Sequence, residues 1–289
     1  MTVASVTDPR PLRRRLPGGR MLRDGSVLYW WGEVTFILVY YFVYSAIRNA
    51  NEGSPAAAKA NALELIAWQQ SLGLNHERML HEWALNIRPL IIACNYFYGS
   101  LHFIVTTGVL VFMYRKFSDE YALWRNAIAI STGIALIGFA LWPLMPPRLL
   151  PAHFGFVDTL DKYPTFWSFK RGAINKISNQ YAAMPSVHCA WALWCALALV
   201  PRVKHTWAKI LAALYPVGTV TSIVLTANHF FLDAVGGFVV LGIGFSIARL
   251  VTRAGRSGED GPETGSDGAM PPTPTPAPTP TPAPTPARG

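Results

Sequence analysis

Long apolar segments separated by short polar ones occupy most of this chain. A membrane-spanning helix needs about 20 mostly apolar residues, and six segments reach or approach that length. They comprise residues 27–47, 90–114, 122–142, 184–200, 207–227 and 231–251. The pattern therefore predicts an all-α fold, a bundle of six transmembrane helices formed by residues 27–252.

The segments outside these apolar runs differ in kind. Residues 1–26 form a basic arm with six arginines, whereas residues 253–289 are polar and end in alternating Thr-Pro and Ala-Pro. That composition cannot build a core, so we expect an extended, disordered tail. Residues 55–88 mix large apolar side chains with charges, which predicts one or two amphipathic helices on the outer leaflet. Such helices are either a structural cover or a lid that positions substrate.

Composition and charge also indicate a membrane protein. Hydrophobic residues make up 51% of the 289 residues and charged residues 14%, against about 25% charged in an average soluble domain. The net charge of +9 does not indicate nucleic acid, because the basic residues lie in short segments that flank apolar runs. The three cysteines lie within apolar runs, and we expect packed free thiols with no disulfide or zinc site.

Positive residues predict the orientation in the membrane. The N-terminal arm, the links after the second and fourth spans, and the residues after the sixth are basic. Six spans put all four on one side, which we assign to the cytoplasm together with both termini. The links 48–89 and 143–183, and the turn near His229, then face the outer side of a cell membrane.

Three short polar segments stand out, and the predicted topology puts all three at this outer interface. The first holds Arg148 among prolines that end the third span, and its guanidinium can bind two phosphate oxygens. In the second, Pro185 suits the first turn of the fourth span, whose free amides and dipole favour an anion. Ser186 adds a hydroxyl that can donate to a phosphate bound there, and His188 lies within reach of the same anion. The structural alternatives are an interfacial arginine, a helix cap and a histidine that faces water.

The third polar segment runs from Asn228 to Asp233 and leads into the sixth span. His229 and Asp233 are four residues apart and share one helical face. A carboxylate bonded to one ring nitrogen fixes the tautomer and raises the basicity of the other nitrogen, which makes a nucleophilic imidazole. A stabilising pair at a helix N-terminus is the structural alternative. Gly236 and Gly237 then allow close helix packing.

Together these segments favour attack of one histidine on phosphorus while the other histidine protonates the departing oxygen. Two histidines without a third ligand argue against zinc, and we expect neither a metal nor another cofactor. The partners implied are membrane lipids: a phospholipid donor with a lipid alcohol acceptor, or a lipid phosphate.

These motifs resemble the type-2 phosphatidic acid phosphatase superfamily. Its signatures are a Lys-then-Arg-Pro segment, Pro-Ser-Gly-His, and Ser-Arg followed by His and Asp four residues apart. The order, topology and helix count are similar over residues 27–252. The resemblance implies that His229 is the nucleophile that forms a phosphohistidine, and that Asp233 orients it. It also implies that His188 is the general acid and that Arg148 binds phosphate.

Several positions depart from these signatures. Leu141 stands where a lysine is expected, and leucine follows Arg148 where proline is usual. Val187 replaces the glycine, and Ile223 stands where the third signature has arginine. Two phosphate-binding cations are therefore absent from their expected positions.

The long outer link offers cations that could replace them, namely Lys170, Arg171 and Lys176. With its Pro-Pro-Arg, Pro-Ser-Val-His and Asn-His-Phe-Phe-Leu-Asp segments, the chain looks more like the inositol phosphorylceramide synthase branch. The members of that branch transfer a phosphorylated head group from a phospholipid to a lipid alcohol.

A further polar set lies in the second span and consists of Asn95, Tyr98 and His102. The spacing of three and four puts these residues on one helical face, which we expect to face the bundle interior. They either form hydrogen bonds between helices, the interpretation we favour, or line a substrate pocket together with Asn228.

The leading hypothesis is a membrane enzyme that transfers a phosphorylated head group, inositol phosphate being one candidate, between lipids at the outer face. With water as the acceptor the same chemistry gives a lipid or polyprenyl phosphate phosphatase, and the sequence does not decide between the two. A transporter is disfavoured, because no internal repeat is evident and the polar residues collect at one interface. A catalytically silent scaffold gains weight from the missing cations, but the retained histidines and aspartate argue against it.

Overall fold

The computed structural model describes residues 17–23, 25–50, 54–165 and 180–259, which are mostly helical. Lys170, Arg171 and Lys176, most of the basic arm and most of the C-terminal tail lie outside the described residues. In chain order the elements are β1 (Gly19–Met21), β2 (Val27–Tyr29), α1 (Trp30–Ala50), α2 (Pro55–Ser71), α3 (Glu77–Leu85), α4 (Arg88–Tyr96), η1 (Phe97–Leu101), α5 (His102–Lys116), α6 (Ser118–Leu141), η2 (Pro147–Leu149), η3 (Ala152–Phe154), α7 (Thr159–Lys162), α9 (Val187–Leu199), α10 (Thr206–Leu225) and α11 (Phe231–Glu259).

A hairpin precedes the first long helix. β1 and β2 pair antiparallel, and Gly25 supplies the left-handed conformation between them (φ +81°). The first apolar run was predicted to be helical from residue 27, but α1 begins at Trp30 because the preceding residues pair as β2. Arg20 Nη1 donates to the Tyr114 carbonyl at 3.0 Å, which ties the hairpin to the end of α5.

Five helical segments of the described chain are long and apolar enough to cross a membrane. They are Trp30–Arg48, Arg88–Lys116, Ser118–Leu141, Thr206–Leu225 and Phe231–Arg253. They correspond to five of the six predicted spans, and their length and apolarity are those of a membrane protein. α11 continues to Glu259, past residue 252 where the polar tail was expected to begin, because no proline follows until Pro262.

The fourth predicted span differs from the expectation. Residues 184–200 contain α9, a helix of 13 residues and thus only about 20 Å long at the usual rise. α9 is short because Ser186 caps it and the chain before the cap is extended, with Ala182 bridged to Leu144. Pro185 therefore precedes the cap and does not lie in the first helical turn, so the prediction for Pro185 was wrong.

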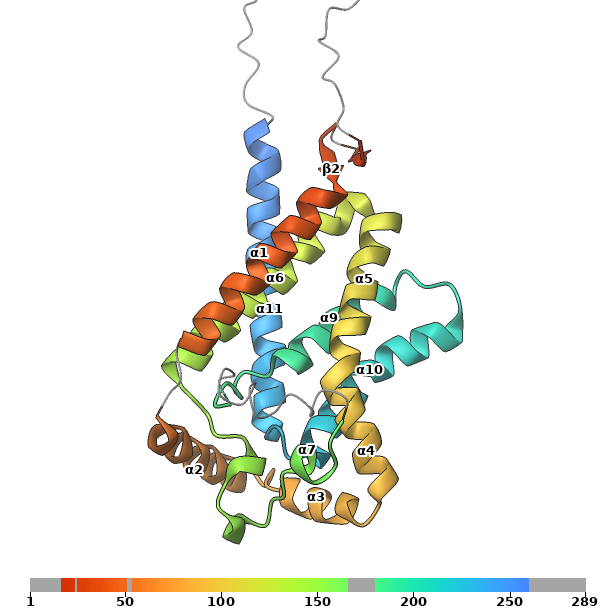
Figure 1. Ribbon diagram of the computed structural model, residues 1–289. Coiled ribbons are helices and arrows are strands. Elements are labelled where there is room, and N and C mark those ends of the chain that lie inside the picture. The colour runs from red at the N-terminus through yellow and green to blue at the C-terminus, as the bar shows by residue number, and fades with distance from the viewer. Residues whose placement is uncertain (1–16, 24, 51–53, 166–179, 260–289) are drawn as a thin grey trace, which may run out of the picture.

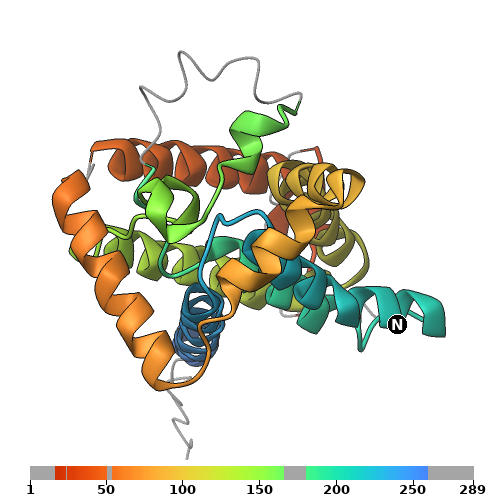
Figure 2. The same ribbon diagram turned by 90° about the horizontal axis from the view of Figure 1, so that it is seen from below.

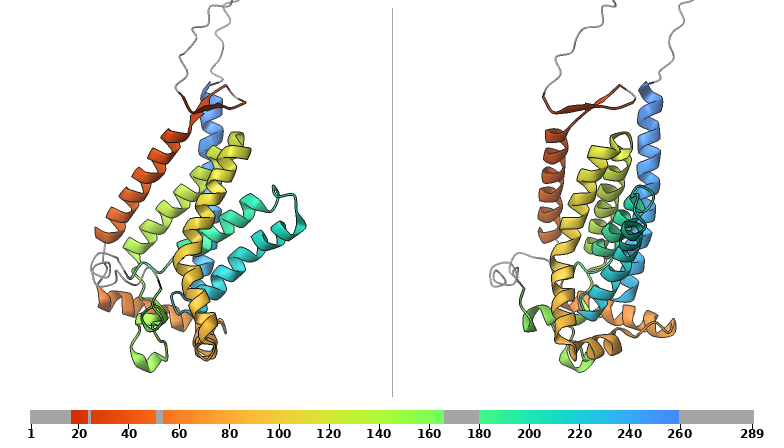
Figure 3. Two further views of the ribbon diagram at one scale, coloured as in Figure 1. Left: turned by 45° about the vertical axis from the view of Figure 1, so that its right-hand side comes forward. Right: turned by 90° about the vertical axis from the view of Figure 1, so that its right-hand side faces the viewer.

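The two ends of the bundle differ. β2 and the C-terminal end of α11 lie at one end, whereas α2, α3 and α7 lie at the other (Figure 1). α1, α5, α6 and α11 run lengthwise between these ends, while α9 and α10 form an inclined pair beside them (Figure 3). Seen from below, α2 and α3 extend across the bundle end beside the start of α11 (Figure 2).

The two helices α2 and α3 occupy the segment that was predicted to hold one or two amphipathic helices. α2 turns one stripe toward the protein, consisting of Ala58, Ala62, Leu65 and Gln69, all fully buried. Gln69 Oε1 accepts from the Leu232 amide at 3.1 Å, and Glu77 Oε1 accepts from the Phe231 amide at 3.0 Å. These helices therefore cap the first turn of α11, whose amides have no partner within the helix.

Small residues on α11 allow its neighbours to approach closely. A Cβ added at Gly237 would lie 2.3 Å from the Ser186 carbonyl oxygen, and one at Gly236 would lie 3.3 Å from Pro185 Cβ. On the α6 side, a Cβ at Gly244 would meet Ser131 Oγ at 2.2 Å. The prediction that Gly236 and Gly237 allow close packing is confirmed.

We predict that Gly237→Ala lowers the thermal stability of the detergent-solubilised protein. The added Cβ overlaps a backbone carbonyl that no side-chain rotation can move, and overpacking of this kind costs about 1–3 kcal/mol. Gly242→Ala is the matched control on the same helix, because a Cβ there meets nothing within 4 Å. Equal melting temperatures for the two variants would contradict this account of the α9–α11 contact.

His81 joins three parts of the bundle end that carries α2 and α3. Its Nδ1 lies 2.8 Å from the Leu225 carbonyl at the end of α10, and its Nε2 accepts from the Val157 amide at 3.1 Å. A carbonyl can only accept and an amide can only donate, so this arrangement requires the neutral ring with the proton on Nδ1. Burial lowers the pKa of His81, although the hydrogen bond to Leu225 acts in the opposite direction.

We predict that acid weakens this junction. Because the folded-state pKa lies below the usual value of about 6.5, the stabilisation is complete above that value and is lost as the pH falls through the lowered pKa. The melting temperature should therefore fall between neutral pH and about pH 5, as measured by a thermal-shift titration. His81→Asn should start lower at neutral pH and lose less on acidification, since its amide does not titrate. An unchanged pH dependence in the variant would rule out His81 as the responsible group.

Candidate active site

Side chains from three helices converge between the bundle and its α2–α3 end. The ring centroids of His188 on α9 and His229, which precedes α11, lie 5.7 Å apart. Tyr98 stacks on His188 with centroids 4.4 Å apart, and His102 meets His188 edge-on at 4.3 Å. The structure thus brings together four of the residues predicted from segments that are far apart in the chain.

The turn between α10 and α11 determines where His229 lies. Ala227 adopts the left-handed conformation (φ 54°), which ends α10 and redirects the chain. The amides of Asn228 and His229 then both donate to the Ile223 carbonyl, at 2.9 and 3.2 Å. Asn228 Nδ2 donates to Thr226 Oγ1 at 2.7 Å, so this side chain stabilises the turn.

His229 and Asp233 form the predicted pair. His229 Nδ1 lies 3.2 Å from Asp233 Oδ2, and the same oxygen accepts from the Phe230 amide at 2.9 Å. Asp233 is fully buried and His229 nearly so. A carboxylate bonded to Nδ1 holds the proton there and leaves the lone pair of the neutral ring on Nε2. The geometry therefore presents Nε2 as the reactive nitrogen.

The start of α9 positions His188. Ser186 is the N-cap, and its hydroxyl accepts from the Cys189 amide at 3.4 Å, so its side chain serves as a helix cap in this structure. The Ser186 amide donates to the Asp233 carbonyl at 2.9 Å, which joins the cap of α9 to the first turn of α11. His188 lies in the first turn, near the positive end of the helix dipole.

A π-helical turn separates α4 from α5 and sorts the polar residues of the second predicted span. Turns of this type inside helices are frequent at functional sites. Tyr98 lies in η1, and its carbonyl is 2.9 Å from His102 Nδ1. The rings of both residues contact the ring of His188. Asn95 instead bonds to Thr159 of α7, with Nδ2 donating to the carbonyl at 2.9 Å and Oδ1 accepting from the hydroxyl at 3.0 Å. Asn95 thus makes the favoured structural bond, while the two aromatic residues line the site.

A cavity of about 280 Å³ opens at these rings. Its lining includes Tyr98, His102, His188 and His229, together with residues of α1 that the sequence analysis did not assign to the site. Arg48 is the residue of α1 that matters chemically, because it is the one permanently charged side chain among the described lining residues. It also acts electrostatically on His188 and Tyr98.

Arg48 was not predicted as a site residue, because an arginine at the end of an apolar run is typical of a topology signal. The spacing of residues along α1 could have indicated that Arg48 belongs to the site. Phe36, Tyr40, Tyr44 and Arg48 recur every four residues, which puts aromatic rings and one cation along one stripe of α1. Only the packing of α1 shows that this stripe faces the histidines.

Arg148 lies close to the site but is held by other groups. Its backbone amide donates to the Ala227 carbonyl at 2.8 Å, and Nη1 donates to Asp158 Oδ2 at 2.8 Å. Its charge acts on Tyr98, but Arg148 is not among the described residues that line the 280 Å³ cavity. The guanidinium keeps further donors that Asp158 does not occupy.

The two positions at which the signatures have cations, Leu141 and Ile223, are not among the described residues that line the 280 Å³ cavity. Ile223 is fully buried and packs with Cys189, Val224 and Ala234, so that position is closed by apolar side chains. Leu141 is 79% exposed at the end of α6.

The described residues that line the cavity include one cation and no carboxylate. Within the described ranges, no group of three or more His, Cys, Asp or Glu side chains could hold a metal ion. The three cysteines are buried free thiols, as predicted. A guanidinium, three imidazoles and a helix N-terminus lie around this cavity, a set that suits the negative charge and oxygen acceptors of a phosphate.

Comparison with known protein families matches residues 63–247 to the PAP2 superfamily. No curated protein and no solved structure matches the chain. The matched segment contains Arg148, His188, His229 and Asp233 but not α1. Members of this superfamily are phosphatases or phosphotransferases that act on lipid phosphates, which fits the anion site described above. Since the match spans more than half of its length, the chain belongs to the PAP2 superfamily.

Proposed function

We propose that this protein transfers the phosphorylated head group of a membrane lipid through a covalent phosphohistidine on His229. The observation that carries the proposal is the buried His229–Asp233 pair, which leaves Nε2 free toward a cavity shared with His188 and Arg48. A nucleophile oriented by a buried acid and facing a second imidazole is the arrangement that covalent catalysis requires.

The proposed reaction has two balanced steps. In the first, the Nε2 lone pair of His229 attacks phosphorus, the bond from phosphorus to the leaving oxygen breaks, and His188 gives that oxygen a proton. In the second, an acceptor oxygen attacks phosphorus, the N–P bond breaks, and the acceptor proton passes to His188. A lipid alcohol as acceptor completes head-group transfer, inositol phosphate being one candidate group, and water would complete hydrolysis.

In this proposal Arg48 is the main side chain that neutralises the charge of the phosphate. Arg48 lines the cavity, whereas Arg148 is not among the described residues of its lining. The N-terminus of α9 adds amide donors and its dipole, with Ser186 as its cap. Lys170 and Arg171 belong to the part of the chain that the structure does not describe, and they stay candidates for further contacts.

We propose that the site faces the outer side of a cell membrane. Basic residues gather at the end of the bundle away from the site, where Arg20 contacts α5, Arg202 pairs with Glu120, and Arg23 pairs with Asp119. Positive charge of this kind indicates the cytoplasmic side. α2 and α3 would then lie at the outer interface, and α9 would be the short fourth member of six spans with its start at the site.

We predict that His229→Ala abolishes turnover of lipid phosphate esters, because it removes the atom that forms the bond to phosphorus. Asp233→Asn should lower turnover by roughly 10²- to 10⁴-fold, since the ring loses its enforced tautomer. The measurement is release or transfer of labelled phosphate by purified protein in mixed micelles, with a lipid alcohol present and absent. Acid-labile label retained on the wild-type chain and lost in His229→Ala reports the intermediate. Full turnover by His229→Ala would overturn the mechanism.

We predict that Arg48→Ala lowers kcat/KM for a lipid phosphate by roughly 10- to 100-fold, the effect of losing a charge-assisted hydrogen bond. Arg48→Lys should recover part of this loss, because it restores the charge but not the planar fork. Arg78→Ala is the matched control, since it removes a positive charge at the same end of the bundle from an exposed side chain paired with Glu82. Equal effects of Arg48→Ala and Arg78→Ala would show that Arg48 acts only through general charge.

A further inference from the structure

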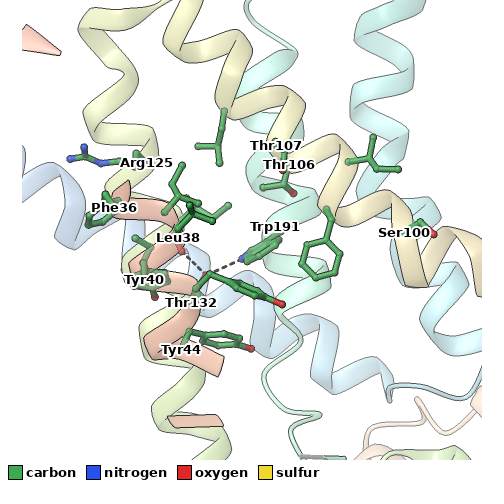
Figure 4. A pocket seen from close by; sticks show the side chains of 17 residues that line it. Phe36, Leu38, Tyr40, Tyr44, Ser100, Thr106, Thr107, Arg125, Thr132 and Trp191 are labelled. Atoms are coloured by element: carbon green, nitrogen blue, oxygen red, sulfur yellow. Dashed lines mark hydrogen bonds between the residues drawn. The ribbon is translucent and has the colours of Figure 1, made fainter. Parts of the chain in front are cut away.

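A second and larger cavity lies along α1 beside the catalytic one. It encloses about 580 Å³ and is lined by α1, α5, α6 and Trp191 of α9. Figure 4 shows Phe36, Tyr40 and Tyr44 of α1 on one wall, with Thr106 and Thr107 of α5 across from them. We call this cavity the α1 groove.

The α1 groove and the catalytic cavity are neighbours with a common wall. Four residues line both of them: Tyr41, Tyr44, Phe103 and Trp191. Its outer edge opens to the surroundings of the bundle, because Leu38 and Ile104 in its lining are 62% and 65% exposed. The groove therefore opens toward the surrounding lipid on one side and borders the cavity of His188 on the other.

Several polar atoms in the groove wall are bonded to the protein itself. Trp191 Nε1 donates to Thr132 Oγ1 at 2.9 Å (Figure 4), and that hydroxyl donates to the Ile128 carbonyl at 2.7 Å. The Tyr40 hydroxyl donates to the Ala129 carbonyl at 2.6 Å. With these donors used, the groove presents a largely apolar surface that suits hydrocarbon and not a polar head group.

We propose that the α1 groove binds one hydrocarbon chain of the lipid whose phosphate binds at Arg48 and His188. This inference rests on the proposed function and adds the place on the protein where one hydrocarbon chain of the substrate binds. The stripe on α1 supports it, because Arg48 stands at the head of a row formed by Tyr44, Tyr40 and Phe36. One helix thus contributes both the cation for the phosphate and the wall for the chain.

The dimensions of the groove agree with a single chain. From Tyr44 to Phe36 the helix rises about 12 Å, which is close to the roughly 15 Å of hydrocarbon in one leaflet. The far end is closed by the ion pair between Arg125 Nη1 and Glu33 Oε1, 2.6 Å apart, with the Arg125 guanidinium 5.0 Å from the Phe36 ring centre. A closed end limits the length of chain that the groove accepts.

The bilayer around the protein determines which molecules can enter the α1 groove. Lipid chains are as apolar as the groove wall, so transfer from the bilayer gives little driving force and shape decides what fits. The groove should therefore affect which lipids react more than how tightly a lipid binds. The α1 wall of the groove lies outside the segment matched to the PAP2 superfamily, residues 63–247, whereas the walls from α5, α6 and Trp191 lie within it.

Thr107→Trp tests the groove, because it places a large ring across the cavity from α5. Val111→Trp is the matched control, one turn away on the same helix, 48% exposed and outside the groove lining. We expect Thr107→Trp to lower kcat/KM for dipalmitoyl phosphatidate about tenfold or more while leaving turnover of dibutyryl phosphatidate unchanged. Val111→Trp should leave both substrates unchanged. Equal loss for the long and short substrates in Thr107→Trp would overturn the proposal.

A second measurement does not depend on activity. A long-chain phosphatidate with a diazirine in the middle of one chain is photolysed with the wild-type protein and with Thr107→Trp. Labelled peptides from α1 and α5 that are lost in the variant support the groove, and labelling spread evenly over the exposed faces of α10 and α11 overturns it. If the wild type labels in the groove but turns over no lipid phosphate ester, with a lipid alcohol present or absent, the proposed function fails and the chain site stands.

Discussion

The buried carboxylate of Asp233 is the interaction on which the site depends. An ionised group with no exposure to solvent is expensive to bury unless fixed donors surround it. His229 Nδ1 and the Phe230 amide are such donors, and both bond to Oδ2. The Asp233 backbone carbonyl accepts from the Ser186 amide. One residue therefore fixes the tautomer of one histidine and the position of the helix that carries the other.

The helices at the α2–α3 end of the bundle support this arrangement from behind. Gln69 and Glu77 bond to each other and cap the amides that open α11, while His81 holds α3 to the end of α10. A helix start needs such partners, because its first amides have none within the helix. The segment between the first two long helices thus has a positioning role whether or not it also meets the bilayer surface.

The distribution of positive charge differs from that of the signatures which the chain resembles. Apolar packing closes the position of Ile223, and Arg148 is paired with Asp158. Arg48 faces the histidines from a helix outside the segment matched to the PAP2 superfamily. Placing the cation on the helix that also forms the α1 groove links recognition of the phosphate to recognition of the hydrocarbon chain in our proposal.

The sequence by itself determined the helical class, five of the spans, the pairing of His229 with Asp233 and the close packing at Gly237. These features depend on local spacing, on apolar length and on the absence of a side chain, all of which can be read along the chain. The sequence overestimated the length of α9. The Ser186 cap and the extended residues before it lie within the same apolar run, so the apolar pattern alone does not reveal where the helix begins. Only the tertiary structure decided that Tyr98 and His102 meet His188 while Asn95 turns to α7, and that Arg48 enters the site. Those placements depend on how separate helices pack, and an arginine at the end of an apolar run has the same local pattern whether it faces water or a phosphate.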